Sequence, residues 1–292
     1  MRYRIEHLTT YTYEEPVGLS YQIAHLRPLD TPWQRCHSHT LDVTPTPQAR
    51  GEGEDYFGNA VCRFELAKPH AKLRILARSE VDVTRGAAPH IDAIEWEEAA
   101  RHFDQPILAL PDERAASEFV FDSPHAPVSE GALAFAARHF TPGRPLLKAV
   151  DSLMHAIHDE FEYDPDATHI GTPVEELLSL GRGVCQDFAH LMIAAIRAMG
   201  LPARYVSGYL LTAPPPGQAR LVGADASHAW VSVFVPGTGW LEFDPTNAVR
   251  PGDEHIVLAY GRDFADVSPL RGVILGGGSH ELDVAVTVTP LP

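Results

Sequence analysis

Cys185 opens a stretch whose residue types suit covalent catalysis. It follows the glycine-bracketed turn Gly181-Arg182-Gly183-Val184 and begins a segment, 184–199, whose apolar residues repeat at helical spacing: Phe188, Leu191, Met192, Ala195 and Met199. A cysteine in the first turn of a helix meets unsatisfied backbone N–H groups and the positive end of the helix dipole, and both favour the thiolate. Because the thiolate is the nucleophile, the position suits covalent chemistry. The alternative is a buried cysteine that packs as a small apolar side chain.

His228 and Asp244 could supply the base and the orienting carboxylate that such a nucleophile needs. His228 starts one predicted strand and Asp244 ends the next, each eight residues from Pro236. The two side chains face each other if the hairpin folds at Pro236, whereas a tight turn centred on Thr238 moves them apart. We therefore expect a bulge or a wide loop in this hairpin. The alternatives are an ordinary histidine, one of 16, and an Asp-Pro turn formed with Pro245.

Three motifs in chain order resemble the bacterial transglutaminase-like superfamily, a papain-like group with catalytic Cys, His and Asp. They lie between about residues 150 and 250 and read Gly183-Val184-Cys185-Gln186-Asp187-Phe188-Ala189-His190, Ser227-His228-Ala229-Trp230-Val231 and Trp240-Leu241-Glu242-Phe243-Asp244-Pro245-Thr246. The start, from Tyr3-Arg4-Ile5-Glu6-His7 to Leu26-Arg27-Pro28, resembles the β-rich N-terminal domain of the same bacterial proteins, and Gly261-Arg262-Asp263-Phe264-Ala265-Asp266-Val267 resembles their tail. The resemblance implies Cys185 as nucleophile, His228 as general base and acid, and Asp244 as orienting carboxylate.

The reaction that the resemblance implies is acyl transfer from an amide through a thioester acyl-enzyme. Water as acceptor gives a cysteine protease or amidase, and an amine gives a transglutaminase or amide ligase; bacterial members with this architecture are usually described as candidate cysteine proteases. The expected partners are a peptide or amide substrate and, for transfer, an amine acceptor. The backbone N–H of Cys185 is the natural first oxyanion donor, and the second stays unassigned. No EF-hand-like loop is present, so no ion or other cofactor is implied.

Two alternatives from other functional classes stay open. One is a scaffold or peptide-binding protein that keeps the fold without turnover. The other is a metalloenzyme that uses the abundant histidines, for example Cys36-His37-Ser38-His39 or the pair His155 and His158. Alternation along a strand sets Cys36 and Ser38 opposite the two histidines, so an ordinary strand surface is the favoured interpretation there. Cys62 is expected to be a core residue of a strand.

Patterns along the chain indicate an α+β fold. Residues 1–85 read as short strands, at 3–13, 20–26, 39–43, 60–66 and 73–83, separated by turns such as Gly51-Glu52-Gly53. Helices are expected at 130–140, 146–161 and 184–199, and a capping box at Thr172-Pro173-Val174-Glu175 is expected to open a further one. Strands follow at 203–211, 228–235, 240–244, 256–260 and 282–289, with Gly276-Gly277-Gly278 as a turn and Pro214-Pro215-Pro216-Gly217 as an exposed loop.

These elements predict four segments. Residues 1–90 form a β-rich N-terminal sheet or sandwich domain, and 91–144 form a helical connection. The resemblance implies that 145–250 form a papain-like transglutaminase core in which the cysteine-bearing helix packs on an antiparallel sheet. Residues 251–292 add strands that complete the fold.

Composition narrows the choice of partners. The 292 residues contain 23 Lys+Arg against 39 Asp+Glu, a formal charge of −16, which argues against a nucleic-acid binder. No apolar run is long enough for a membrane span, and the charged first residues lack the pattern of a signal peptide. The three cysteines do not make a disulfide framework. We expect a cytoplasmic protein; the composition leaves the oligomeric state open.

Overall fold

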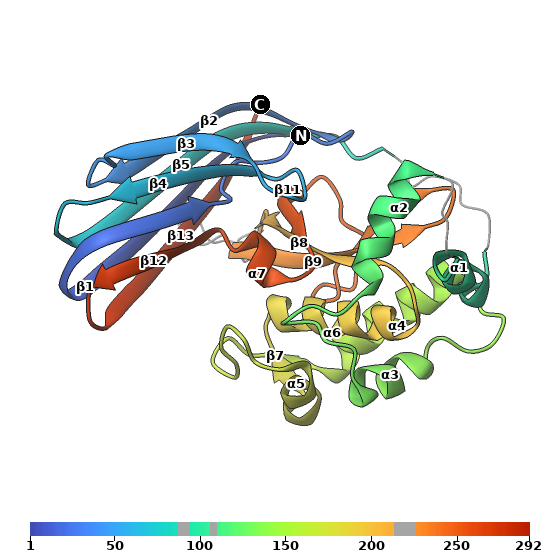
Figure 1. Cartoon of the computed structure of the whole chain (residues 1–292). Helices are drawn as coiled ribbons and strands as arrows, with labels where there is room; N and C mark the ends of the chain where they lie inside the picture. Colours follow the sequence, from blue (N-terminus) through green and yellow to red (C-terminus); the bar gives the residue numbers. More distant parts are fainter. Residues whose placement is uncertain (87–93, 106–109, 213–225) are drawn as a thin grey trace, which may run out of the picture.

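A computed structural model describes residues 1–86, 94–105, 110–212 and 226–292 (Figure 1). A large curled antiparallel sheet forms one side of the molecule, and helices packed under a smaller sheet form the other. This arrangement confirms the predicted α+β class. Among the described residues, no helix is both long and apolar enough to cross a membrane.

The large sheet has the strand order β2-β5-β1-β4-β3, and β12 and β13 also pair with β1. Its strands are β1 (Arg2–Ala24), β2 (Gln34–Thr44), β3 (Ala49–Glu54), β4 (Ala60–Leu66), β5 (His70–Val83), β12 (Leu270–Gly276) and β13 (His280–Leu291). The first half of β1 lies between β5 and β13, and its second half lies between β4 and β12. The long strand β1 therefore ties the two ends of the chain into one sheet.

The smaller sheet has the order β10-β9-β8-β11, and all its neighbouring strands are antiparallel. Its strands are β8 (Ala203–Leu210), β9 (Ala226–Val235), β10 (Gly239–Phe243) and β11 (His255–Gly261). The helices are α1 (Trp96–Phe103), α2 (Pro111–Ser117), the 3₁₀ turn η1 (Glu118–Val120), α3 (Glu130–Ala137), α4 (Leu146–Glu160), α5 (Val174–Leu180), α6 (Cys185–Ala198) and α7 (Phe264–Val267). A short parallel pair, β6 (Glu162–Tyr163) and β7 (Arg182–Gly183), lies beside α5.

Helix α6 lies at the centre of the helical side, between β8 and β9 above it and α3, α4 and α5 around it (Figure 1). Every residue from Asp187 to Arg197 is buried. The apolar core that includes this helix continues into the large sheet through Tyr3, Ile5, Val81 and Val286. The two sheets thus share one core, which fixes α6 relative to both.

Several local expectations were wrong. Thr172 to Glu175 form no capping box, because Pro173 occupies the N-cap position and the Glu175 carboxylate instead accepts the Gly131 N–H at 3.2 Å. Residues 51–53, expected as a turn, lie inside β3, where pairing with β4 overrides the turn preference of glycine. Strand β12 was not predicted, and the expected strands at 3–13 and 20–26 are one strand, β1.

The final strands return to the sheet that the first residues begin, whereas β11 joins the smaller sheet. The C-terminal segment therefore contributes to both sheets. The boundaries of the four predicted segments stay a prediction.

Candidate active site

The turn before α6 determines the position of Cys185. Helix α5 ends at Gly181, whose left-handed backbone (φ 66°) suits glycine. At Gly183 a Cβ would come within 2.8 Å of Asp187 Oδ2, the oxygen that accepts the Val184 N–H at 2.9 Å. The glycine thus makes room for the carboxylate that caps the helix. Cys185 follows as the first residue of α6, and it is partly exposed.

His228 and Asp244 form a buried pair. His228 Nε2 donates to Asp244 Oδ2 at 2.8 Å, and the two side chains are 6% and 0% exposed. The Cys185 side chain hydrogen bonds to His228. Because Nε2 faces the carboxylate, Nδ1 is the ring nitrogen left for the sulfur. The structure thus brings the three predicted site residues together in the order thiol, imidazole, carboxylate.

The hairpin that carries this pair does not contain the expected bulge or wide loop. Strands β9 and β10 pair in register from Gly239 opposite Val235 to Phe243 opposite Val231. Continuing this register sets Asp244 level with Trp230, on the same face as His228 and one diagonal step away. Diagonal neighbours on one face of a sheet are within reach of long side chains. A tight turn is therefore compatible with the His228–Asp244 hydrogen bond, and our expectation was wrong because it considered only directly opposed residues.

Asp244 accepts five hydrogen bonds. Oδ1 accepts the backbone N–H groups of Thr246 and Asn247 at 3.0 and 3.2 Å. Oδ2 accepts from His228, from Asn247 Nδ2 at 2.7 Å and from His255 Nε2 at 3.0 Å. A carboxylate with this many donors is held in one orientation and kept ionised.

His255 is a site residue that the sequence did not reveal. The predicted strand began one residue later, at Ile256, and no motif includes His255. Its position follows from the pairing of β11 with β8, which sets His255 opposite Leu210 at the end of the sheet where β9 begins. The side chain is 5% exposed and reaches Asp244 Oδ2 at 3.0 Å from β11, the edge strand at the far end of the sheet from β10.

The charges in this cluster reinforce one another. Burial alone would lower the pKa of His228, but hydrogen bonds and charge interactions with Asp244 and Cys185 outweigh burial and raise it to about 10. Burial likewise would raise the pKa of Asp244, but its hydrogen bonds to His228, His255 and Asn247 and the His228 charge lower it well below its ordinary value. The resting state favoured at neutral pH is therefore an imidazolium between a carboxylate and the sulfur.

Trp230 packs against both histidines of the cluster. Its ring centroid lies 5.9 Å from that of His228 and 5.3 Å from that of His255. Gly208, directly across from His228 in β8, makes this packing possible, because a Cβ there would overlap the Trp230 ring and the Ile256 carbonyl oxygen. Glycine at this position thus permits Trp230 to pack against both imidazoles, tilted by 30° to His228 and nearly perpendicular to His255.

Two tyrosines lie near the cysteine. Tyr163 ends β6, pairs with Gly183 of β7 and packs edge-on against Phe188 at 6.5 Å. It is 54% exposed. Partial burial of the side chain, followed by the charge of the nearby Cys185, raises the pKa of its phenol. Tyr205 of β8 is buried, and burial, followed by the charges of Cys185 and Asp187, raises its phenol pKa far more. Tyr163 is therefore the tyrosine of the two that combines proximity to the sulfur with access from outside.

The cluster also has the composition of a metal site. One ligand atom each from His228, Asp244 and His255 lies within 4.8 Å of the others, a two-histidine, one-carboxylate set. Both histidine nitrogens, however, donate to the carboxylate, and Asn247 Nδ2 points at the same oxygen and lies 3.5 Å from His228 Nε2. An amide N–H aimed at this point opposes a cation. The donor set fits a hydrogen-bonded cluster better than a metal site, and the expected lack of a cofactor stays a prediction.

The other sequence candidates lie elsewhere. His37 contacts Asp82 at 2.7 Å, His39 contacts Ser79 at 2.9 Å, and Cys36 is buried. His155 and His158 both bind backbone carbonyl groups, and Cys62 is buried in β4 as expected. The loop Pro214-Pro215-Pro216-Gly217 lies outside the described residues.

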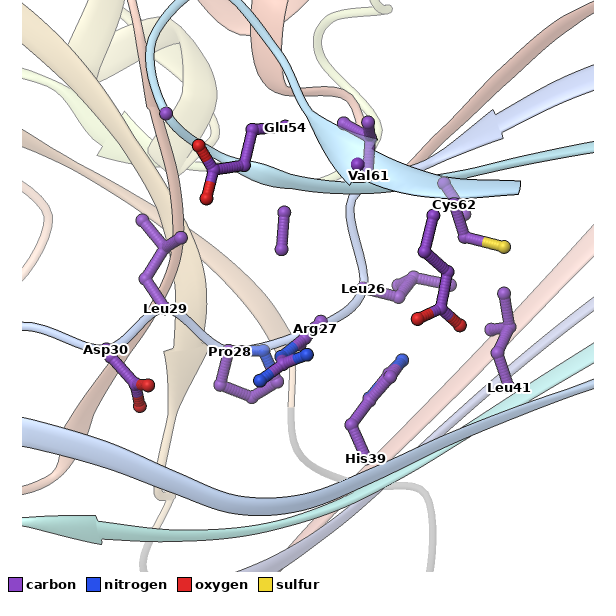
Figure 2. A pocket seen from close by; sticks show the side chains of 15 residues that line it. Leu26, Arg27, Pro28, Leu29, Asp30, His39, Leu41, Glu54, Val61 and Cys62 are labelled. Atoms are coloured by element: carbon purple, nitrogen blue, oxygen red, sulfur yellow. The ribbon is translucent and has the colours of Figure 1, made fainter.

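A cavity of about 470 Å³ lies in the large sheet, remote from Cys185 in the sequence. Figure 2 shows Arg27, His39 and Glu54 around its open centre, with Cys62 at one side. Its lining residues all fall between Ala24 and Cys62. The cavity therefore belongs to the N-terminal sheet and does not include the cysteine, histidine and carboxylate cluster.

Comparison with protein families divides the chain into two matched regions. Residues 3–82 match the bacterial transglutaminase-like N-terminal region, and residues 134–245, which include Cys185, His228 and Asp244, match the transglutaminase-like superfamily. An uncharacterised protein of Mycobacterium tuberculosis is 40% identical over 297 residues, which cover 99% of this chain and 93% of that protein. The chain belongs to the bacterial transglutaminase-like superfamily. This confirms the resemblance seen in the motifs.

Further comparisons find other similar proteins and a solved structure of similar fold. An uncharacterised protein of Mycobacterium leprae is 33% identical over 99% of each chain. A protein-glutamine gamma-glutamyltransferase of Pseudomonas aeruginosa is 36% identical over 124 residues, or 39% of this chain and 19% of that one. The solved structure of a candidate cysteine protease of Cytophaga hutchinsonii superposes with a TM-score of 0.77 and 22% identity, covering 100% of this chain and 91% of that one. The predicted transglutaminase-like fold is thus confirmed.

Proposed function

We propose that the protein is a cysteine-dependent acyl transferase or hydrolase that acts on amides through a thioester on Cys185. The observation that carries this proposal is the buried His228–Asp244 hydrogen bond of 2.8 Å beside a partly exposed cysteine at the first residue of α6. The position of the cysteine, at a helix N-terminus and in hydrogen-bond contact with His228, supports its role as the nucleophile.

The proposed first half-reaction uses the protonated His228 as its acid. The Cys185 thiolate attacks the carbonyl carbon of the substrate amide, and the C–N bond breaks as the His228 imidazolium gives its proton to the departing amine. The products are a thioester and a neutral imidazole. Because the negative sulfur has then become a thioester, one of the two causes of the raised His228 pKa is gone, and His228 becomes a base.

The proposed second half-reaction returns the enzyme to its starting state. His228 takes a proton from water or from an amine as that acceptor attacks the thioester, and the C–S bond breaks to release the thiolate. Asp244 holds the imidazole in position and stabilises its charged form throughout. Water yields an acid and an amine yields a new amide, so the acceptor alone distinguishes hydrolysis from transfer.

The negative oxygen that develops in both steps needs hydrogen-bond donors. The N–H of Cys185 belongs to the first turn of α6, whose N–H groups have no partner within the helix. We propose the Tyr163 hydroxyl as the second donor, because Tyr163 is paired to the strand that leads into Cys185 and is accessible from outside. The sequence alone left this second donor unassigned.

A scaffold function gains no support from the geometry. Such a protein has no need of a hydrogen bond between His228 and Asp244, and a wide separation of the two would have favoured it. The observed contact of 2.8 Å is what a working triad requires.

Trapping the acyl-enzyme tests the proposed function. Purified protein is incubated with a peptide pool at pH 7, quenched in acid and analysed by mass spectrometry. We expect an adduct on the peptide that contains Cys185, absent from Cys185→Ala and present at unchanged level in the matched control Cys62→Ala. Addition of a primary amine should release the adduct as an amide if the protein is a transferase, whereas a hydrolase releases only the acid. Amide turnover that persists in Cys185→Ala would overturn the proposal.

A further inference from the structure

His255 shares the Asp244 carboxylate with His228. His228 Nε2 and His255 Nε2 reach the same oxygen, Oδ2, at 2.8 and 3.0 Å. His255 is 5% exposed, and none of the three motifs that identify the superfamily includes it. A buried polar side chain that bonds directly to a proposed triad member can influence the reaction through that member.

The hydrogen bonds of His255 determine where its proton lies. Its Nδ1 accepts the backbone N–H of Gly252 at 3.3 Å, so Nδ1 carries no proton. The proton of the neutral ring must then be on Nε2, the nitrogen that faces Asp244. The Gly252 contact thus makes His255 a donor to the carboxylate, and Trp230, packed at 81° to the ring, holds the imidazole in this orientation.

A carboxylate that accepts a second imidazole N–H is less basic than one that serves a single imidazole. The His255 hydrogen bond lowers the pKa of Asp244, next after the His228 bond among the favourable contacts. The groups that act on Asp244 are His228, His255, the Asn247 amide and the backbone N–H groups of Thr246 and Asn247, and those that act on His228 are Asp244 and Cys185. Both His255 and the Asn247 amide donate to Oδ2 and so weaken the hold of Asp244 on the His228 proton, and His255 has the larger effect of the two on the Asp244 pKa.

We propose that His255 is a positioning residue that shares the Asp244 carboxylate, so that His228 holds its proton less tightly than it would against an unshared carboxylate. This role rests on the proposed function, in which His228 must give a proton to the departing amine. An imidazolium bound too tightly to Asp244 would be a poor acid for that step. His255 thereby adjusts the acid strength of His228 without touching the substrate.

The test measures the titration of His228 in the resting protein. The ring nitrogens of His228 are followed by NMR against pH in a Cys185→Ala background, which removes the sulfur's contribution and brings the transition to lower pH. We expect His255→Leu to raise the pH at which His228 loses its proton by about half a unit or more. His255→Gln, whose amide N–H can replace Nε2, should leave it unchanged. His139→Leu, at a buried histidine between α3 and α4, is the matched control and should also leave it unchanged.

Each outcome decides the inference. An unchanged or lowered His228 transition in His255→Leu overturns it, since His255 would then be a packing residue or a support for the orientation of Asp244 alone. If His255→Leu does not fold, His255→Asn serves instead, because its shorter amide can reach Gly252 but not Asp244, and it should raise the transition as Leu does. In the enzyme with Cys185 intact, kcat should fall in His255→Leu with KM little changed, and His255→Gln should restore it. Because the titration needs no turnover, it stands even if acyl-enzyme trapping on Cys185 fails.

Discussion

Replacing Asp244 with asparagine removes one negative charge and leaves a side chain of the same shape. The pKa of His228 lies at about 10 rather than 6.5, which corresponds to about 5 kcal/mol in favour of the imidazolium. Asp244 and Cys185 are the two sources of this effect. Because burial opposes these two sources, together they exceed this net figure; if each contributes about half, the variant should lose at least about 2–3 kcal/mol, and the His228 transition should move from about 10 to about 8 or below.

The Asp244→Asn variant is measured in two ways. The His228 ring is titrated by NMR, and Cys185 is alkylated with iodoacetamide over a range of pH, with buried Cys36 and Cys62 as slow internal references. In wild-type protein Cys185 should react faster than the other two. In Asp244→Asn we expect the lower His228 transition and a fall in amide turnover of at least about 100-fold, because both the imidazolium and its orientation depend on the carboxylate.

Asp42→Asn is the matched control, since it removes the same charge from an exposed aspartate of the large sheet. It should change neither the His228 titration nor turnover. If Asp244→Asn shifts the His228 transition by no more than Asp42→Asn does, the carboxylate does not set the charge state of the imidazole, and the electrostatic account of this site is wrong.

Three further outcomes are expected. Tyr163→Phe should lower kcat by about 10- to 100-fold with little change in KM or stability, because it removes an oxyanion donor from a half-exposed ring; an unchanged kcat would exclude that role. Gly208→Ala should destabilise the fold by about 1–3 kcal/mol in urea unfolding, because the new methyl group displaces Trp230. Since Trp230 packs against His228, the change should also slow Cys185 alkylation. A wild-type alkylation rate would contradict this reasoning. The third change, His228→Gln, should lower the free energy of unfolding most below pH 6.5, and this loss should shrink towards pH 10. A histidine whose folded pKa is raised from 6.5 to about 10 stabilises the fold fully below pH 6.5 and progressively less above it. Equal losses at pH 6 and pH 10 would refute the raised pKa.

The parts of the site that depend on local structure could be predicted from the sequence. Gly181 and Gly183 mark the end of one helix and the start of the next, because backbone conformation and close approach at these two positions favour glycine. The apolar repeat after Cys185 then fixes a buried helix with the cysteine at its first residue. Both inferences depend on interactions within a few residues, and such interactions are encoded locally.

The contacts that complete the site depend on long-range pairing. His228 meets Asp244 along a diagonal of the β9–β10 hairpin, and His255 meets them because β11 pairs with β8 rather than with its neighbours in the chain. Likewise β12 and β13 return to β1, more than 240 residues away in the sequence. Alternating apolar residues predict that a segment is a strand, but they do not identify its partner or register, because many pairings bury the same side chains. The sequence by itself determined the position of Cys185 at the start of its helix and the order of the motifs; the tertiary structure decided which side chains share the carboxylate.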